Sequence, residues 1–151
     1  MKLIKNNPAV TGQVFPALIL TLSFLGFLDA TYLAILHYKN AFPPCTITTG
    51  CETVLTSKYA TVIGLPISLA GSLFYLLLIG LSILILTDFK KIFANILTLI
   101  VLSGALVSAI LIYVQFFILK AFCQYCLFSE GINFILVIFS FLLIRQKKIF
   151  K

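Results

Sequence analysis

Four cysteines are the residues of this chain best suited to chemistry. They form two pairs: Cys45 and Cys51 lie six positions apart, and Cys123 and Cys126 form a C-x-x-C motif. That motif is typical both of redox-active dithiols and of one half of a zinc site. Four cysteines also allow three patterns of disulfide pairing, which the spacing alone does not resolve. The pairs therefore indicate redox-active, structural or metal-binding thiols.

Two acidic residues, Asp29 and Glu130, stand inside long apolar segments, where an ionisable group is costly and so suggests a function. Glu130 follows Cys126 by four positions, which places it one helical turn deeper on the same face, within reach to exchange a proton. It could instead lie at the membrane surface and extend to water or pair with Lys120. Asp29 is a candidate for proton transfer or for a hydrogen bond between helices. Its candidate partners are Tyr113, Gln115 and the neighbours of Thr31.

The composition shows which kind of fold must position these residues. Of the 151 residues, 62% are hydrophobic and 10% are charged, and the mean hydropathy is +1.18. Soluble domains carry roughly 25% charged residues, so a water-soluble globule, a disordered chain and a small disulfide scaffold are excluded. The net charge of +7 does not indicate nucleic acid as a partner, because the lysines lie in short clusters between apolar runs.

Four apolar runs are long enough to cross a membrane, which takes roughly 20 helical residues for about 30 Å of hydrocarbon. They cover about residues 14–36, 66–87, 92–117 and 126–144. No charged residue lies between Lys58 and Asp88, and the runs lack the alternation of barrel strands. We therefore expect an all-α integral membrane protein, a bundle of four transmembrane helices that forms a single domain over residues 1–151.

Basic residues are unevenly divided between the two ends of such a bundle. With four spans, both termini lie on one side, together with eight basic residues: Lys2, Lys5, Lys90, Lys91, Arg145, Lys147, Lys148 and Lys151. Three lie on the other side: Lys39, Lys58 and Lys120. The positive-inside rule places both termini in the cytoplasm. The cysteines then face an extracytoplasmic space such as the periplasm, where disulfides persist.

The first outer loop, residues 38–65, is expected to contain a short helix. Pro43 and Pro44 prevent the first span from continuing into it. Three apolar residues within 51–59 follow helical spacing: Val54, Leu55 and Tyr59. They predict an amphipathic helix across the outer mouth of the bundle, with one cysteine of the loop pair at its start.

The C-x-x-C pair lies where the fourth span begins. The free amides and the macrodipole of a helix N-terminus favour a thiolate at Cys126, which we expect to be the deeper sulfur. Cys123, one turn earlier and nearer water, is expected to exchange with another dithiol. The two pairs lie on the same side of the bundle and could form a relay. Its electron acceptor must dissolve in the membrane and take two electrons, and a quinone fits.

Other roles for the cysteines lead to different classes of protein. Structural disulfides at these spacings close small rings, which stabilise little. A zinc site of four thiolates would lie in an oxidising compartment with only His37 as a further ligand. Either role would make the chain a non-catalytic membrane subunit. A carrier of reductant across the membrane would need cysteines on both faces, and the inner side has none.

Together these features resemble the vitamin K epoxide reductase family, in particular its bacterial members. The resemblance covers nearly the whole chain and combines the four spans, the two cysteine pairs and three motifs: Cys51-Glu-Thr-Val-Leu-Thr-Ser57-Lys-Tyr, Gly64-Leu-Pro and Gly71-Ser-Leu-Phe-Tyr75. It implies a disulfide-generating thiol:quinone oxidoreductase of the bacterial inner membrane. The quinone would be ubiquinone or menaquinone.

The resemblance implies a role for each cysteine. Cys126 would react with the quinone, and Cys123 would be its disulfide partner. Cys45 would exchange with a thioredoxin-fold protein, and Cys51 would pass the electrons on by attacking Cys123. Many bacterial members carry a fused thioredoxin-like domain, whereas this chain ends at Lys151. A separate, periplasmic DsbA-like protein is therefore the expected partner.

Four further residues are expected at the quinone site. Ser57, Phe74 and Gln115 match positions near or lining the quinone pocket of the family. Glu130 stands where the vertebrate enzymes carry a tyrosine, four residues after the second active-site cysteine. The epoxide-reducing specificity of those enzymes is therefore not expected here.

Overall fold

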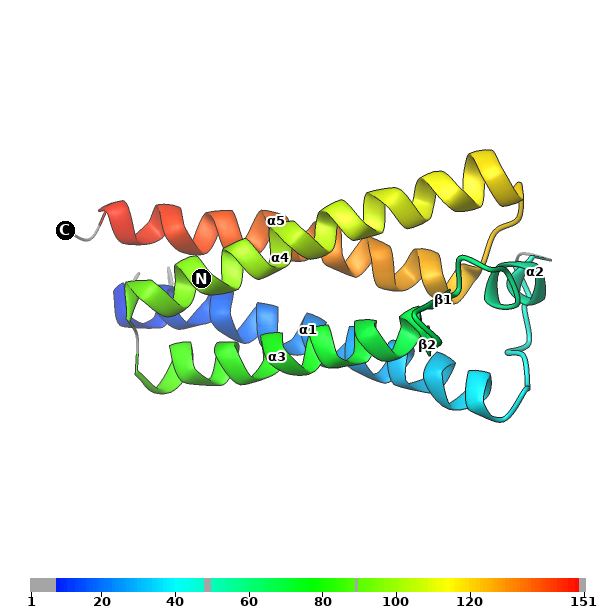
Figure 1. Cartoon of the computed structure of the whole chain (residues 1–151). Helices are drawn as coiled ribbons and strands as arrows, with labels where there is room; N and C mark the ends of the chain where they lie inside the picture. Colours follow the sequence, from blue (N-terminus) through cyan, green and yellow to red (C-terminus); the bar gives the residue numbers. More distant parts are fainter. Residues whose placement is uncertain (1–7, 48–49, 89, 150–151) are drawn as a thin grey trace, which may run out of the picture.

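The computed structural model describes residues 8–47, 50–88 and 90–149, and within these ranges the side chains of residues 13–145. In this part of the chain, four long helices form the fold: α1 (Pro8–Tyr38), α3 (Ile67–Thr87), α4 (Lys91–Tyr113) and α5 (Gln124–Ile149). A π-helical segment, η1 (Val114–Leu119), extends α4. Successive long helices run in opposite directions, so the bundle has an up-down-up-down topology (Figure 1). The expected four-helix membrane bundle is confirmed.

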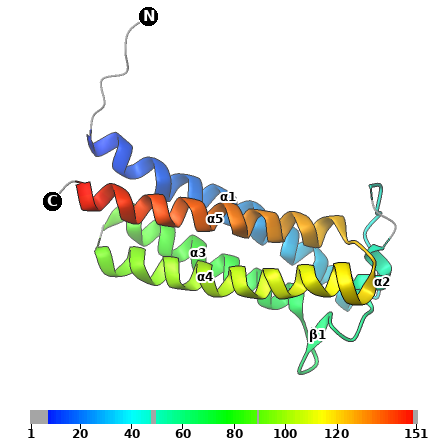
Figure 2. The same ribbon diagram turned by 90° about the horizontal axis from the view of Figure 1, so that it is seen from above.

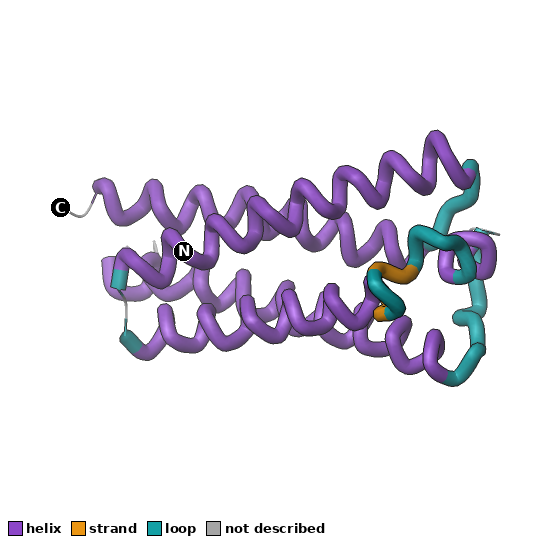
Figure 3. The backbone as a smooth tube through the Cα atoms, in the orientation of Figure 1, coloured by secondary structure: helices purple, strands orange, loops and turns teal. Residues whose placement is uncertain are grey.

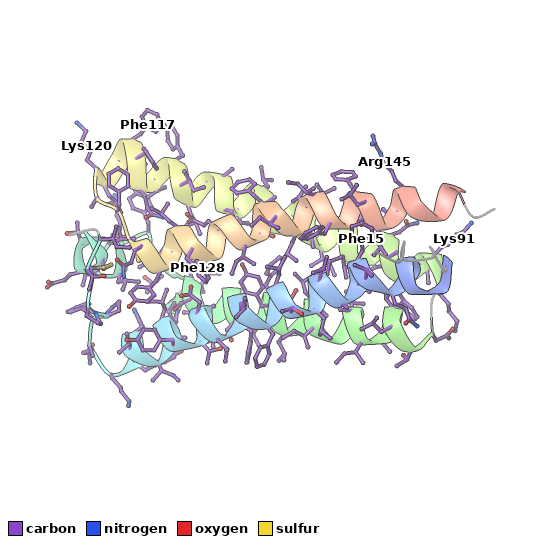
Figure 4. All side chains as sticks on the ribbon, turned by 180° about the vertical axis from the view of Figure 1, so that it is seen from behind. Phe15, Lys91, Phe117, Lys120, Phe128 and Arg145 are labelled. Carbon is purple, nitrogen blue, oxygen red and sulfur yellow. A yellow bond between two sulfur atoms is a disulfide. The ribbon has the colours of Figure 1, made fainter. Side chains whose placement is uncertain are left out.

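Four stretches are long and apolar enough to span a membrane: Gln13–Tyr38 in α1, Ile67–Thr87 in α3, Lys91–Leu119 in α4 with η1, and Gln124–Arg145 in α5. Each boundary expected from the sequence lies within two residues of the observed one. Large apolar side chains such as Leu73 and Leu99 are exposed on the outside of the bundle. Phe117 also points away from it (Figure 4). An exposed apolar surface of this extent is suited to lipid, so the chain is a multi-pass membrane protein.

The interior of the bundle is apolar and closely packed. Helix α1 packs against α3 and α5, and α4 packs mainly against α5 (Figure 2). Six large side chains are fully buried between the helices: Ile19, Leu78, Leu97, Val101, Leu136 and Leu143. Ser82 is also buried, and its hydroxyl donates to the Leu78 carbonyl at 2.7 Å within the same helix. Small residues of this kind allow transmembrane helices to approach closely.

Apart from the short α3–α4 connection, the described non-helical segments gather at one end of the bundle (Figure 3). We call this the cysteine end, formed by residues 39–47, 50–66 and 120–123. It contains the short helix α2 (Cys51–Leu55) and a hairpin of two strands, β1 (Thr61–Val62) and β2 (Leu65–Pro66), which pair antiparallel. The opposite end, which we call the terminal end, carries the start of α1, the end of α5 and the α3–α4 connection (Figure 1).

The short helix expected over residues 51–59 is present but ends earlier. Helix α2 stops at Leu55 because the next two side chains bond back to the backbone. The Thr56 hydroxyl donates to the Glu52 carbonyl at 2.8 Å, and the Ser57 hydroxyl donates to the Val54 carbonyl at 2.8 Å. Such local hydrogen bonds compete with helix continuation.

The basic residues that bear on orientation are placed at both ends. Figure 4 shows Lys91 and Arg145 toward the terminal end and Lys120 at the cysteine end. Lys2, Lys5 and Lys151 lie outside the described residues. The location of both termini in the cytoplasm stays a prediction.

A close contact between α1 and α3 provides a test of the packing. A Cβ atom added at Gly26 would overlap the Tyr75 ring, whose hydroxyl is held by the Ser129 carbonyl at 2.7 Å. Gly26→Ala should therefore destabilise the protein by about 1–3 kcal/mol, measured as a lower Tm in detergent. Gly80→Ala is the matched control, because nothing lies within 4 Å of its added Cβ, and its Tm should not fall. Equal Tm values for the two variants would contradict the packing.

Candidate functional site

The two cysteine pairs lie together at the cysteine end, in different redox states. Cys45 and Cys51 are joined by a disulfide, with their Cα atoms 6.2 Å apart. Cys123 and Cys126 are thiols, and the Cys126 sulfur lies 2.8 Å from the Cys123 sulfur. Cys51 and Cys123 are buried in one apolar cluster with Val54, and the other two cysteines pack against it. The structure thus brings all four predicted cysteines into one site.

Three contacts hold the disulfide loop against the start of α5 and the residues just before it. The Ile47 amide donates to the Gln124 side-chain oxygen at 3.0 Å, and the Tyr125 hydroxyl donates to the Pro44 carbonyl at 3.5 Å. Gly50 approaches this segment so closely that an added Cβ would lie 2.6 Å from the Phe122 nitrogen. A side chain at this position would push the loop away. The glycine therefore allows the loop pair to pack over the C-x-x-C pair.

Cys123 occupies the capping position just before α5. Its sulfur accepts hydrogen bonds from the Cys126 thiol and from the Cys126 backbone amide, the latter at 3.4 Å. The thiol hydrogen bond is the main cause that lowers the pKa of Cys123, and the backbone amides add to it, although burial acts in the opposite direction. The structure therefore favours a thiolate at Cys123.

This arrangement corrects two expectations about the C-x-x-C pair. The helix-terminal amide was expected to stabilise Cys126, but α5 begins at Gln124, so the amide reaches the Cys123 sulfur instead. Cys123 was also expected nearer water, yet its side chain is 0% exposed because the disulfide loop covers it. Cys126 is half-buried and lines an internal cavity. Cys123 thus faces the loop pair, and Cys126 faces the bundle interior.

Gln115 connects the buried acid to the C-x-x-C segment. Its side-chain nitrogen donates to both carboxylate oxygens of Glu130, at 3.2 and 3.3 Å, and its oxygen accepts from the Cys123 amide at 3.0 Å. Its backbone carbonyl accepts from the Ala121 amide at 3.2 Å. Gln115 belongs to η1, whose wider π-helical turn is often found at functional sites. One side chain thus fixes both the acid and the start of α5.

Glu130 is not the surface carboxylate that the sequence left open as an alternative. It is 5% exposed, whereas Lys120 is exposed to solvent and makes no ion pair in the described part of the chain. Because Glu130 follows Cys126 by one turn, both side chains line the same cavity. The acid is therefore available to the chemistry of the cavity.

Asp29 does not make the hydrogen bonds expected for it. Tyr113 is 56% exposed on the outside of α4, and Gln115 is bonded to Glu130 and Cys123 instead. Among the described side chains, Oδ2 of Asp29 and the Thr31 hydroxyl are buried with no hydrogen-bond partner. The hydrogen bonds considered between Asp29 and Tyr113 or Gln115 are therefore not formed.

A cavity of about 340 Å³ lies between the four long helices and opens to the Cys126 sulfur. Its wall includes three of the residues predicted at the quinone site, namely Ser57, Phe74 and Glu130. Gln115, the fourth, does not line it but lies behind Glu130. Cavities of roughly 300–1,000 Å³ with an apolar wall and few polar groups are typical of small-molecule sites.

The cavity fits the head group of a quinone. The wall is mostly apolar, as a flat ring requires, and Cys126 and Glu130 supply a sulfur and an acid at its edge. Asn133 also lines it, and the side-chain oxygen of this residue is buried without a partner. Sequence reasoning missed Asn133, although its spacing from Cys126 and Glu130 places all three on one helical face.

The zinc alternative gains no support from the geometry. Within residues 8–47, 50–88 and 90–149, no group of three or more His, Cys, Asp or Glu side chains is placed to hold a metal ion. Two of the four thiols required for such a site are joined in the Cys45–Cys51 disulfide.

Comparison with known families finds one match. Residues 17–141 match the vitamin K epoxide reductase family, and this segment includes both cysteine pairs and the cavity-lining residues of all four long helices. No curated protein is similar enough to this chain to count as a relative.

The central role of Gln115 can be tested by its removal. Gln115→Leu leaves the Glu130 carboxyl group and the Cys123 amide buried without their partner, at an expected cost of about 1–3 kcal/mol for each group. The Tm in detergent should fall clearly. Gln13→Leu, the same substitution at an exposed position of α1, should change it little. A Tm equal to that of the Gln13 variant would show that these hydrogen bonds do not hold the site.

Proposed function

The chain belongs to the vitamin K epoxide reductase family, and from this premise we propose that it oxidises a protein dithiol and passes the electrons to a membrane quinone. The family implies a quinone-coupled thiol oxidoreductase. One observation carries the finer proposal. Cys51 and Cys123 are buried in the same cluster, while Cys126 opens into an apolar cavity. This arrangement gives electrons a path from the loop to the bundle interior.

Electrons enter at the loop pair. A thiolate of the partner attacks the Cys45 sulfur, which breaks the Cys45–Cys51 bond and forms a mixed disulfide. The second thiol of the partner then displaces Cys45, so the partner leaves with a disulfide and the loop pair becomes a dithiol. Cys45 suits the first step because it is half-buried, whereas Cys51 is 2% exposed.

The electrons then move within the protein. The Cys51 thiolate attacks Cys123 in a Cys123–Cys126 disulfide, so a Cys51–Cys123 bond forms and Cys126 is released. Cys45 next attacks Cys51, which restores the loop disulfide and releases Cys123 as a thiolate. The lowered pKa of Cys123 favours this release, since a thiol of lower pKa leaves faster. The result is an oxidised loop and a reduced C-x-x-C pair.

The last step takes place in the cavity. A bound quinone, ubiquinone or menaquinone, supplies an acceptor of two electrons, and Cys126, Ser57, Phe74 and Glu130 are the residues that would hold it. Cys126 gives up the electrons from the cavity wall as it forms a disulfide with Cys123. Glu130 is placed to move a proton, with Gln115 fixing its carboxyl group. The net result is one disulfide in the partner and one quinol.

We place the protein in the bacterial inner membrane with its cysteine end toward the periplasm. Eight basic residues on the side of the termini against three on the other support this orientation. A disulfide at the membrane surface is within reach of a soluble protein with a thioredoxin fold. The partner proposed for it is a periplasmic DsbA-like protein, which regains its disulfide in the exchange.

The role of Cys126 predicts the effect of its removal. With a small reducing dithiol under anaerobic conditions, the purified protein should reduce quinone, and Cys126→Ala should abolish quinol formation. Ser140→Ala is the control, since Ser140 is buried on the same helix outside the cavity and should retain activity. Quinol formation by the Cys126 variant at the normal rate would overturn the assignment, and a folded but inactive unmodified chain would overturn the function.

Removal of Cys45 should block electron donation by the protein partner but not by small dithiols. Cys45→Ala should still reduce quinone with a small dithiol but not with a reduced DsbA-like protein. Since Cys45 is the thiol that resolves the Cys51–Cys123 bond, this bond should accumulate and be found as linked peptides by mass spectrometry. Turnover of the protein partner at the normal rate would show that the loop pair is not the entry point.

A further inference from the structure

Asn133 is a buried polar residue to which the proposed reaction gives no role. Its side chain is 2% exposed and lines the cavity. Its Nδ2 donates to Oγ of Ser108 at 3.1 Å, whereas Oδ1 is buried with no hydrogen-bond partner. Buried polar atoms are almost always paired in proteins. An unpaired one on a cavity wall therefore points to a partner that enters the cavity.

The position of Asn133 along α5 shows which part of a ligand it would meet. Cys126, Glu130 and Asn133 follow each other at intervals of one turn on one face of the helix. A helical rise of 1.5 Å per residue places Asn133 about 4.5 Å deeper than Glu130 and about 10 Å deeper than Cys126. A para-quinone carries its two oxygens on opposite sides of one flat ring. When one oxygen lies near Cys126 and Glu130, the other points toward Asn133.

The space around Asn133 is shaped by its neighbours. An added Cβ at Gly104 of α4 would lie 3.0 Å from Nδ2 of Asn133 and 2.5 Å from the nearest atom of the Phe74 ring. Ser108, one turn further along α4, is buried and lines the same cavity. The amide therefore lies close to Gly104 and is held by the Ser108 hydroxyl. Such positioning is what a precise contact to a ligand requires.

The Asn133–Ser108 pair suits both redox states of a quinone. While Nδ2 of Asn133 donates to Ser108, Oδ1 remains free to accept a hydrogen bond from a hydroxyl group of a ligand. If the amide turns over, the Ser108 hydroxyl can donate to Oδ1, and Nδ2 becomes a donor for a carbonyl group. A quinone presents carbonyl oxygens, and the quinol presents hydroxyl groups.

We propose that Asn133, positioned by Ser108, binds the quinone oxygen that lies farther from Cys126. This assignment rests on the proposed function and extends it. The cavity would then recognise the second oxygen of the quinone as well as its flat ring.

A comparison of two ligands on two variants tests the proposal. The probes are 2-methyl-1,4-naphthohydroquinone and 2-methyl-1-naphthol, which differ by one hydroxyl group. Protein kept reduced with a dithiol cannot oxidise either, so Kd values can be obtained from the rise of Tm with ligand concentration. The unmodified chain should bind the naphthol about tenfold more weakly, the effect of one lost hydrogen bond in a buried site. In Asn133→Leu the two Kd values should agree within about twofold.

Two further variants control for folding and for the substitution itself. Ser108→Ala removes the group that positions the amide, and its tenfold preference should shrink. Asn95→Leu, the same substitution at an exposed position of α4, should keep the preference of the unmodified chain. A tenfold preference that persists in Asn133→Leu or in Ser108→Ala would overturn the assignment. An unmodified chain that binds neither probe and reduces no quinone would instead overturn the proposed function.

Discussion

The hydrogen bonds of Gln115 join the two halves of the site. A membrane span has no water in its surroundings, so each polar group must find its partner within the protein. The Gln115 side chain is the hydrogen-bond partner of two such groups, the Glu130 carboxyl group and the Cys123 amide. Because the same residue fixes the acid and the start of α5, the position of Cys126 relative to the cavity also depends on it. The π-helical turn of η1 places the side chain there.

The second constraint is the seating of the disulfide loop, which determines the order of electron transfer. The close approach of Gly50 to Phe122 and the hydrogen bond from Ile47 to Gln124 hold the loop against the start of α5. The loop thereby covers Cys123, so this sulfur is accessible to the loop pair and not to solvent. Cys126, one turn deeper, lines the cavity. A dithiol carried by a partner protein must therefore exchange with the loop before electrons reach the quinone.

The sequence predicts the scaffold better than the site. Runs of about 20 residues without charge permit little besides spanning helices, so the four spans and their boundaries were predictable. The cysteine pairs and the cavity residues Ser57, Phe74 and Glu130 were also predicted, in part from the family resemblance. The burial of Cys123 was not, because it depends on a distant loop folding back. Nor was the position of Gln115, since a π-helical turn leaves no periodic pattern in the sequence.

The half of the bundle toward the terminal end mainly stabilises the fold, and the half toward the cysteine end carries the candidate site. Toward the terminal end, the buried hydroxyls of Thr98 and Ser140 donate to carbonyls of their own helices, among apolar side chains such as Leu97 and Leu143. Among the described residues, four buried side-chain atoms have no hydrogen-bond partner. Those of Asp29, Thr31 and Asn133 lie in the half of the bundle nearer the cysteine end, and that of Ser23 lies midway along α1. Unpaired polar atoms destabilise a membrane bundle, and they are tolerated here because the apolar half holds the helices in place. On the cavity wall, the unpaired oxygen of Asn133 is thereby left available to a ligand.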